Sequence, residues 1–135
     1  KAQFNTAIYY ASLFDDGNAF LWYKKASDNG IPEAKTNLGI MYAEARVVER
    51  DYKKAMTLWL DAASHGDPVA QSSLGVLYEN GLGVKQSYQS AMKWYMKAKD
   101  QGDQRAIRRL GVMYSEGYGV ERSETKANEF FDLLD

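Results

Sequence analysis

The chain has 135 residues, of which 45% are hydrophobic and 26% charged, and its formal net charge at pH 7 is −1. This length and apolar content suit one domain with a core of its own, while scattered charges of both signs argue against a dedicated nucleic-acid binder. No apolar stretch approaches the roughly 20 residues of a membrane-spanning helix, and the lack of cysteine excludes disulfides and cysteine-ligated metals.

One pattern recurs along the chain at intervals of 36 residues. Its fixed points are an alanine, a Leu-Gly pair and a tyrosine, followed by a second alanine, an aromatic pair and a closing glycine. The first set stands at Ala34, Leu38-Gly39 and Tyr42, and it returns at residues 70–78 and 106–114. A fixed period of this length is typical of stacked repeats. The sequence therefore predicts a single domain of four repeats, at residues 1–30, 31–66, 67–102 and 103–135.

The first repeat follows the pattern loosely. Thr6 and Ala7 replace the Leu-Gly pair, and Tyr10 precedes Tyr42 by 32 residues instead of 36. We therefore expect the connection between its two helices to be four residues shorter, around residues 15–17. Asp15 or Asp16 is expected to cap the second helix.

The later repeats each predict two helices, here called helix A and helix B. In the third repeat, Ala70, Leu74 and Leu77 have helical spacing on helix A, and Ala91 and Tyr95 have it on helix B. The expected N-caps of helix B are Asp51, Ser87 and Ser123, and the expected closing residues are Gly30, Gly66 and Gly102. Asp67-Pro68 supplies an N-cap and a first-turn proline for the next helix A.

The second repeat lacks the two glycines that follow helix A in the third. Ala45 and Val47 stand where Gly81 and Gly83 stand 36 residues later. Glycine tolerates a positive φ and alanine or valine does so poorly. Helix A of the second repeat is therefore predicted to continue through Ala45 or Arg46 before it turns.

These fixed points resemble the Sel1-like repeat, a member of the tetratricopeptide-like α-solenoids, over nearly the whole chain. The resemblance implies an all-α fold: a right-handed superhelix of αα-hairpins, with about four repeats, eight helices and a concave face lined by helices A. It also implies a non-catalytic scaffold or adaptor for a protein or peptide partner, without a cofactor. The family is common in bacteria, which leaves the periplasm and the cytoplasm open as compartments and suggests a complex-assembly or immunity-type protein.

Helix-A positions that differ between repeats are expected to form an exposed stripe on the concave face and are the candidates for partner binding. They occur as triplets with spacing i, i+1 and i+4, and they change from neutral polar to doubly basic along the chain. An acidic or extended peptide would suit the arginines. We name these nine positions the helix-A stripe: Thr36, Asn37, Ile40, Ser72, Ser73, Val76, Arg108, Arg109 and Val112.

No residue is predicted to be catalytic or to bind a metal. Trp22, Trp59 and Trp94 recur at fixed helix-B positions, which favours packing over a stacking platform. His65 precedes the closing Gly66 and would favour a helix C-terminus electrostatically. The Gly-x-Gly-Val segments follow a helix and lack the remainder of a phosphate-binding motif, so they are interpreted as turns.

Two alternatives to a partner-binding module stay open. The chain could be a structural segment of a longer array, because Leu134 occupies the position of Ala98 and no closing glycine follows. The other is an enzyme, since cysteine-rich relatives are linked to β-lactam binding or hydrolysis. The absence of cysteine argues against that activity here. The oligomeric state stays open.

Overall fold

The computed structural model describes residues 1–135, which form eight α-helices and no strand. The all-α prediction is confirmed. The helices are α1 (Ala2–Ser12), α2 (Asp16–Asp28), α3 (Pro32–Ala43), α4 (Tyr52–Ser64), α5 (Pro68–Asn80), α6 (Tyr88–Lys99), α7 (Gln104–Glu116) and α8 (Glu124–Phe131).

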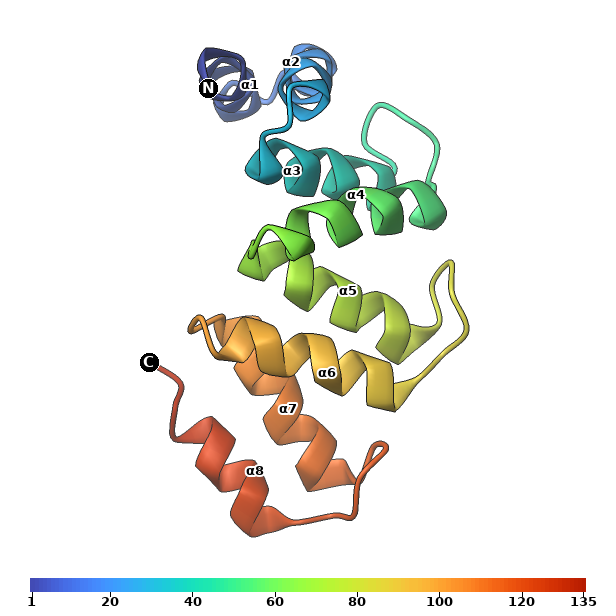
Figure 1. The fold of residues 1–135 in the computed structure, drawn as a ribbon, viewed down its shortest axis with the longest axis vertical. Helices are drawn as coiled ribbons and strands as arrows, with labels where there is room; N and C mark the ends of the chain where they lie inside the picture. The colour runs from blue at the N-terminus through green and yellow to red at the C-terminus, as the bar shows by residue number, and fades with distance from the viewer. The chain divides into compact units, whose positions relative to one another are not determined.

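The chain divides into two compact units, Lys1–Asp67 and Pro68–Asp135. The N-terminal unit holds α1 to α4 and the C-terminal unit holds α5 to α8, so each contains two hairpins. Within each unit every helix packs against the next one along the chain (Figure 1). Odd-numbered helices are the predicted helices A and even-numbered ones the helices B.

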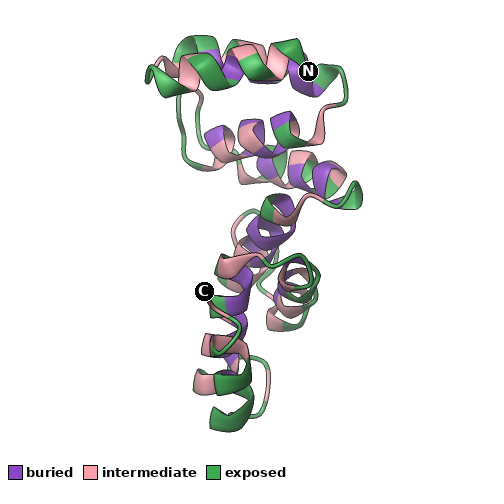
Figure 2. Cartoon of the chain, turned by 90° about the vertical axis from the view of Figure 1, so that its left-hand side faces the viewer, coloured by how far each residue is buried: buried purple, intermediate pink, exposed green.

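In the cores, each of the packed helices contributes both alanines and large side chains. In the N-terminal unit, Ala34, Leu38 and Met41 of α3 cluster with Ala26 and Tyr23 of α2. The corresponding cluster in the C-terminal unit joins α6 and α7 through Ala91, Tyr95, Ala98, Ala106, Leu110 and Met113. Buried positions accordingly lie on the facing sides of paired helices, and exposed ones lie outside (Figure 2).

The predicted helix boundaries are confirmed where local chemistry determines them. Asp15 accepts a hydrogen bond from the Asn18 N–H and caps α2. Side chains of Asp51, Ser87 and Ser123 cap α4, α6 and α8 in the same way. The predicted closing glycines have left-handed backbones, with φ of 83° at Gly30, 90° at Gly66 and 82° at Gly102.

The predicted extension of α3 is wrong. The helix ends at Ala43, and Ala45 and Val47 have φ of 56° and 73°, close to the 66° and 70° of Gly81 and Gly83. A hydrogen bond that recurs in the loops after α3, α5 and α7 explains this. The Arg46 N–H donates to Met41 O at 2.9 Å, as the Leu82 N–H donates to Leu77 O at 3.0 Å and the Tyr118 N–H donates to Met113 O at 2.9 Å. The path required by packing therefore overrides the local preference of alanine and valine.

The connection in the first hairpin is short, as predicted, but it covers Leu13–Asp15 instead of residues 15–17, because Asp16 and Gly17 already belong to α2. Its tight turn places Phe14 at a φ of 58° with 90% of its surface exposed. The Asp15 N–H donates to Tyr10 O at 3.0 Å, as the Asp51 N–H donates to Tyr42 O at 3.1 Å, so the short turn keeps this loop hydrogen bond of the other hairpins.

Candidate functional site

The helix-A stripe is only partly at the surface. Thr36, Ser72 and Ser73 are 2%, 0% and 4% exposed, so the expectation that the triplets form a solvated stripe is wrong for these three. Asn37, Ile40, Val76, Arg109 and Val112 are half-buried, and Arg108 is exposed. The stripe therefore divides into buried positions and positions that a partner can reach.

The buried hydroxyls connect one helix A to the turn before the next. Thr36 donates to Asp67 Oδ2, and Ser72 donates to Asp103 Oδ2 at 3.3 Å. Asp103 also accepts from the Ala106 N–H at 2.9 Å and thereby caps α7. A short polar side chain at this position can satisfy the aspartate without leaving a buried group unpaired. These hydroxyls therefore have structural partners within the chain.

Asn37 and Ile40 line a hollow in the N-terminal unit between α1, α2 and α3. Tyr23 and Arg46 also line this hollow. Arg46 donates to Asp16 Oδ1 at 2.8 Å, and this hydrogen bond raises the pKa of the guanidinium. The two charged side chains that line this hollow, Arg46 and Asp16, therefore form an ion pair with each other.

Val76 and Arg109 line a second hollow, between α5 and α7 in the C-terminal unit. We name it the α5–α7 hollow; its volume is about 260 Å³, and its lining residues are Val76, Glu79, Asn80, Tyr95, Arg105 and Arg109. The lining thus combines an apolar side chain, Val76, with the buried Tyr95 and with three charged side chains. Of the nine stripe positions, the structure brings only Val76 and Arg109 together here.

Glu79 is the centre of a hydrogen-bond network in this hollow. Its side chain is 8% exposed, accepts from Tyr95 Oη at 2.7 Å, and accepts from Arg109 through Nε at 3.2 Å and through Nη2. Burial is the main cause that raises the pKa of Tyr95 far above its usual range, and the hydrogen bond to Glu79 raises the pKa of Arg109. Arg109 is therefore committed to an internal ion pair.

Arg105, like Glu79 and Asn80, lines the hollow but is not among the positions that the sequence singled out. Its Nη2 donates to Ser72 Oγ at 2.8 Å and to Ser73 Oγ at 2.9 Å, while the residue as a whole is exposed. The position carries Glu33 in the second repeat and Val69 in the third, so it varies between repeats as the stripe positions do. This variation and its place one turn before Arg109 on the same helix face were the available hints.

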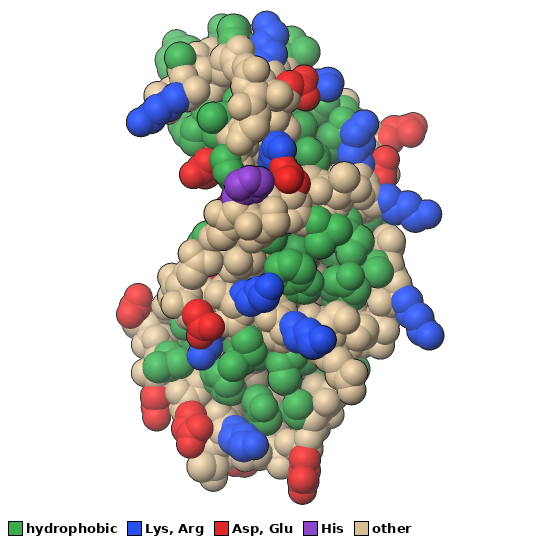
Figure 3. Space-filling model, viewed as in Figure 1, with side chains coloured by type: hydrophobic (Ala, Val, Ile, Leu, Met, Phe, Trp, Pro, Cys, Tyr) green, Lys and Arg blue, Asp and Glu red, His purple; other side chains and the backbone are tan.

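The remaining candidates are separate from the hollow. Arg108 and Val112 lie on α7 but do not line it, and no hydrogen bond or ion pair engages Arg108. On the face shown in Figure 3, basic side chains stand singly among neutral atoms and acidic groups. That face has no continuous basic band of the kind that tracks a phosphate backbone.

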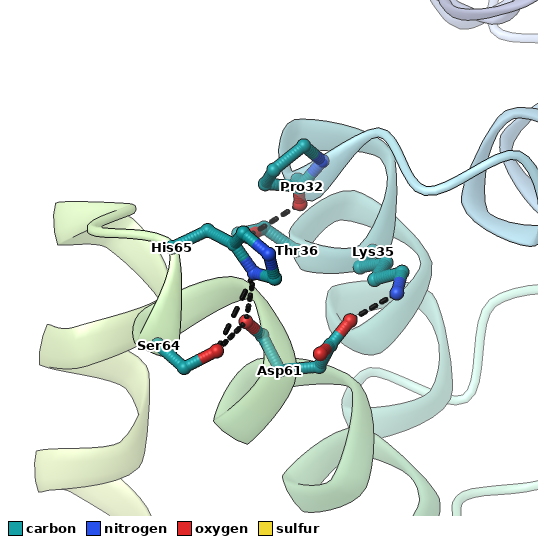
Figure 4. A network of polar contacts seen from close by, with 6 residues as sticks. All are labelled: Pro32, Lys35, Thr36, Asp61, Ser64 and His65. Carbon is teal, nitrogen blue, oxygen red and sulfur yellow. Dashed lines mark hydrogen bonds and ion pairs between the residues drawn. The ribbon is translucent and has the colours of Figure 1, made fainter.

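His65 lies at the end of α4, beside a lysine–aspartate pair. Its Nδ1 is 2.9 Å from Asp61 O and 3.4 Å from Ser64 Oγ, while the Asp61 carboxylate pairs with Lys35 of α3 (Figure 4). The hydrogen bond from Lys35 is the main cause that lowers the pKa of Asp61. The polar contacts around His65 thus serve a carbonyl near the C-terminal end of α4 and the Lys35–Asp61 ion pair between α3 and α4.

The tryptophans divide between core and surface. Trp59 is 4% exposed, and its Nε1 donates to Thr36 O at 2.9 Å, so the core prediction is confirmed for it. Trp22 and Trp94 are half-buried, with Lys25 Nζ at 4.3 Å and Lys97 Nζ at 4.9 Å from the ring centroids. A cation already covers each of these two rings.

Two serine–lysine pairs have Ser-x-x-Lys spacing, Ser90 with Lys93 and Ser123 with Lys126. Ser123 Oγ accepts from the Lys126 N–H and caps α8, and Ser90 Oγ accepts from Ser87 Oγ at 3.2 Å in the first turn of α6. Both pairs therefore belong to capping turns. No helix is long and apolar enough to cross a membrane, and no three His, Asp or Glu side chains are grouped to hold a metal ion.

Comparison with known proteins accounts for the recurring geometry. The Sel1 repeat pattern matches residues 1–31, 32–67, 68–103 and 104–133. The chain belongs to the Sel1 repeat family. Sel1 repeats are protein-interaction modules, and the four matches cover all four hairpins. None of the curated proteins compared with the chain matches it in sequence.

Two solved Sel1-type structures are similar to this chain. A Sel1 repeat protein from Oxalobacter formigenes has 32% identity and a TM-score of 0.90 over 97% of this chain and 55% of that one. A protective antigen of uropathogenic Escherichia coli strains, described as displaying an SLR fold, has 34% identity and a TM-score of 0.90 over 98% of this chain and 29% of its own. The chain thus spans about half the length of the first protein and under a third of the length of the second.

An immunity protein from Pseudomonas aeruginosa is a more distant match. It has 24% identity and a TM-score of 0.46 over 87% of this chain and 57% of that one. A likeness at this level supports no inference about function.

Proposed function

We propose that this Sel1 repeat chain is a non-catalytic module that binds a protein or peptide, with the α5–α7 hollow as its contact in the C-terminal unit. The observation that carries the proposal is an open hollow whose lining differs from its counterpart in the N-terminal unit. Helix-A positions change from Asn37 to Arg109 there, while the tyrosine below, Tyr23 or Tyr95, stays the same. A constant frame with variable surface positions is how repeat proteins obtain specificity.

The chemistry of the hollow favours binding over catalysis. Because burial raises the pKa of Tyr95, its phenol stays protonated and cannot act as a base near neutral pH. Glu79 already accepts hydrogen bonds from Tyr95 and Arg109, so it is not free to take a proton from a substrate. Positioned charges with one apolar wall suit partner recognition.

Affinity capture from the native source tests the proposal. The wild-type chain and two variants serve as baits: Val76→Glu plus Arg108→Glu alters the helix-A surface, and Lys93→Glu alters an exposed position of α6. We expect a partner on the wild type and on Lys93→Glu that the double variant does not retain. Retention by all three baits, or capture by none, would contradict the proposed function.

The identity of the captured partner tests the finer part of the proposal. A complex-assembly or immunity role, which the family suggests, requires a protein subunit or a secreted effector as the partner. A captured small metabolite or nucleic acid would exclude both roles.

A structural segment of a longer array is the second candidate, and the outer face of α1 favours it. Tyr9 is 58% exposed, whereas its counterparts Met41 and Met113 are 3% and 0% exposed beneath the preceding helix B. We expect helix B of another Sel1 repeat to cover this face. Sedimentation as a monomer up to millimolar concentration, unchanged in Tyr9→Glu, would argue against it.

A further inference from the structure

We infer that the α5–α7 hollow binds a carboxylate group of the partner, and that Arg105 is its anchor. The inference deepens the proposed function and rests on it, because it names the chemistry that the same hollow accepts. Arg105 lies at the edge of the hollow, exposed to solvent and held by two hydroxyls.

The guanidinium of Arg105 is oriented before any partner arrives. Ser72 and Ser73 are buried, and both hydroxyls accept from the same nitrogen, Nη2. Ser72 is fixed in turn by Asp103, at 3.3 Å. A guanidinium carries five N–H donors in a planar fork. Since Nη2 supplies only two of them, the donors on Nε and Nη1 remain for a ligand.

The hollow carries an uncompensated positive charge. The charges of Glu79 and Arg109 neutralise each other in their ion pair, and Tyr95 Oη donates a further hydrogen bond to Glu79. Arg105 has no carboxylate within ion-pair distance, since its partners are the two serines. The side chains that line the hollow therefore sum to one positive charge. Because both edges of the guanidinium fork include Nη2, which the serines occupy, a carboxylate oxygen accepts a single charge-assisted hydrogen bond from Nη1 or from Nε of Arg105.

The dimensions of the hollow limit what accompanies the carboxylate. Its volume of about 260 Å³ admits a side chain or a chain end, and Val76 supplies an apolar wall for methylene groups. We therefore expect either an aspartate or glutamate side chain or a C-terminal carboxylate. Both sources present the same group to Arg105.

The hollow of the N-terminal unit lacks the anchor and serves as an internal comparison. There Arg46 is paired with Asp16 at 2.8 Å and with Glu44 at 3.6 Å. The position that corresponds to Arg105 carries Glu33. We expect an anionic group to be rejected by this hollow and accepted by the α5–α7 hollow.

Three synthetic peptides of equal length test the inference by NMR. The first has glutamate side chains and an amidated C-terminus, the second has glutamine side chains and a free C-terminus, and the third has glutamine side chains and an amidated C-terminus. The readout is the Arg105 Nε–Hε signal and the amide signals of α5 and α7. We expect shifts with the first peptide, the second or both, which identifies the source, and none with the third.

Two variants make the result specific for Arg105. Loss of a charge-assisted hydrogen-bonded pair corresponds to about a 10-fold or greater loss of affinity, which we expect for Arg105→Gln. Arg122→Gln removes an exposed arginine from the same unit and should change affinity less than about 2-fold. Fold integrity of Arg105→Gln is read from its amide spectrum, and shift mapping on the wild type locates the ligand independently.

Three outcomes would overturn the inference: no shift with either carboxylate peptide, equal losses for the two arginine variants, or shifts confined to α1–α3. Inorganic phosphate is a further arm, and stronger shifts with phosphate than with the glutamate peptide would also overturn it. If capture of the partner depends on the helix-A surface but not on Arg105, the proposed function stands and this inference fails. If capture fails with every bait, the proposed function itself fails.

Discussion

The backbone of Gly75 packs directly against the ring of Tyr95. A methyl group at Gly75 would lie 2.6 Å from Tyr95 Cδ1, well inside van der Waals contact. The same relationship joins Gly39 to Trp59 and Gly111 to Phe131, with corresponding distances of 2.8 Å and 2.6 Å to Cδ1. The glycine after each leucine is therefore the point at which helix A meets the aromatic ring of its own helix B.

We predict that Gly75→Ala lowers the free energy of unfolding by about 1–3 kcal/mol, the usual cost of overpacking a well-packed core. Tyr95 is fully buried, and its Oη donates to Glu79 at 2.7 Å, so the ring cannot move away from a methyl group without straining this hydrogen bond. Gly17→Ala is the control, because a Cβ there would meet only Asp15 Oδ1 at 3.8 Å and alanine favours a helix. Urea unfolding should show the control equal to or more stable than wild type; a comparably stable Gly75→Ala would contradict the packing argument.

The loop after α3 predicts a stabilising substitution. Val47 has a φ of 73°, a region that costs an L-residue roughly 1–2 kcal/mol and that glycine adopts freely. Glycine also increases the entropy of the unfolded chain, which offsets part of this gain. We therefore expect Val47→Gly to raise the free energy of unfolding by about 0.5–1 kcal/mol.

Val48→Gly is the matched control for this loop, since Val48 is the next residue and its φ is not positive. There the added chain entropy has no compensation, so thermal or urea unfolding should show a loss of stability. Equal effects of the two substitutions would mean that the left-handed backbone at Val47 carries no strain.

Most of the fold could be predicted from the sequence, because local signals for helix starts and ends agree with the 36-residue repeat. Caps such as Asp51 and closing glycines such as Gly66 act within one helix turn, so their effect can be inferred without knowing the packing. Ala45 and Val47 could not be predicted in this way. Their backbone is set by a loop path that the packing of α3 against α4 requires, and the rest of the chain compensates for the local cost.

The site was less predictable because a helix A can contact neighbours on several sides. α7 packs against α6 and α8 and also touches α5, so only a narrow strip of its surface stays open. Helical spacing alone therefore assigned Ser72 and Ser73 to the surface, although they support Arg105 from below. Arg105 itself varies between repeats without a pattern, and only the structure shows which hydroxyls hold it.

Thr36→Val separates a structural role from a binding role. Valine has the shape of threonine but cannot donate to Asp67, so the free energy of unfolding should fall by about 1 kcal/mol. Thr57→Val is the control, since Thr57 is exposed and donates only to Lys53 O of its own helix. Calorimetry with the captured partner should show unchanged affinity for both variants. A loss of affinity without a loss of stability in Thr36→Val would restore Thr36 as a binding residue.

The Lys35–Asp61 pair predicts a small pH dependence of stability. Because the folded pKa of Asp61 lies below its usual 3.8, its contribution is present above that value and is lost as the pH falls through the folded pKa. With the Asp61 side chain 43% exposed, solvent screening keeps this contribution below about 1 kcal/mol. Urea unfolding should show Asp61→Asn less stable than wild type at pH 6 and equal to it near pH 2; a constant difference would contradict the linkage.

Glu79→Gln is expected to strengthen carboxylate binding while it weakens the fold. The substitution removes the negative charge that cancels Arg109, so the lining of the α5–α7 hollow gains one positive charge. A charge beside the ligand at the protein surface changes the binding free energy by about 1 kcal/mol or more, so affinity for the glutamate peptide should rise at least roughly 5-fold at low salt.

The cost to stability follows from the same pair. Glutamine keeps an oxygen that can accept from Tyr95 and Arg109, so the loss should stay at about 2 kcal/mol, below that of leaving a buried charge unpaired. Glu121→Gln removes an exposed carboxylate from the same unit and controls for net charge. Titrations at two salt concentrations should show the gain for Glu79→Gln alone, and its disappearance in combination with Arg105→Gln. A gain of equal size in Glu121→Gln would mean that overall charge, and not the hollow, governs binding.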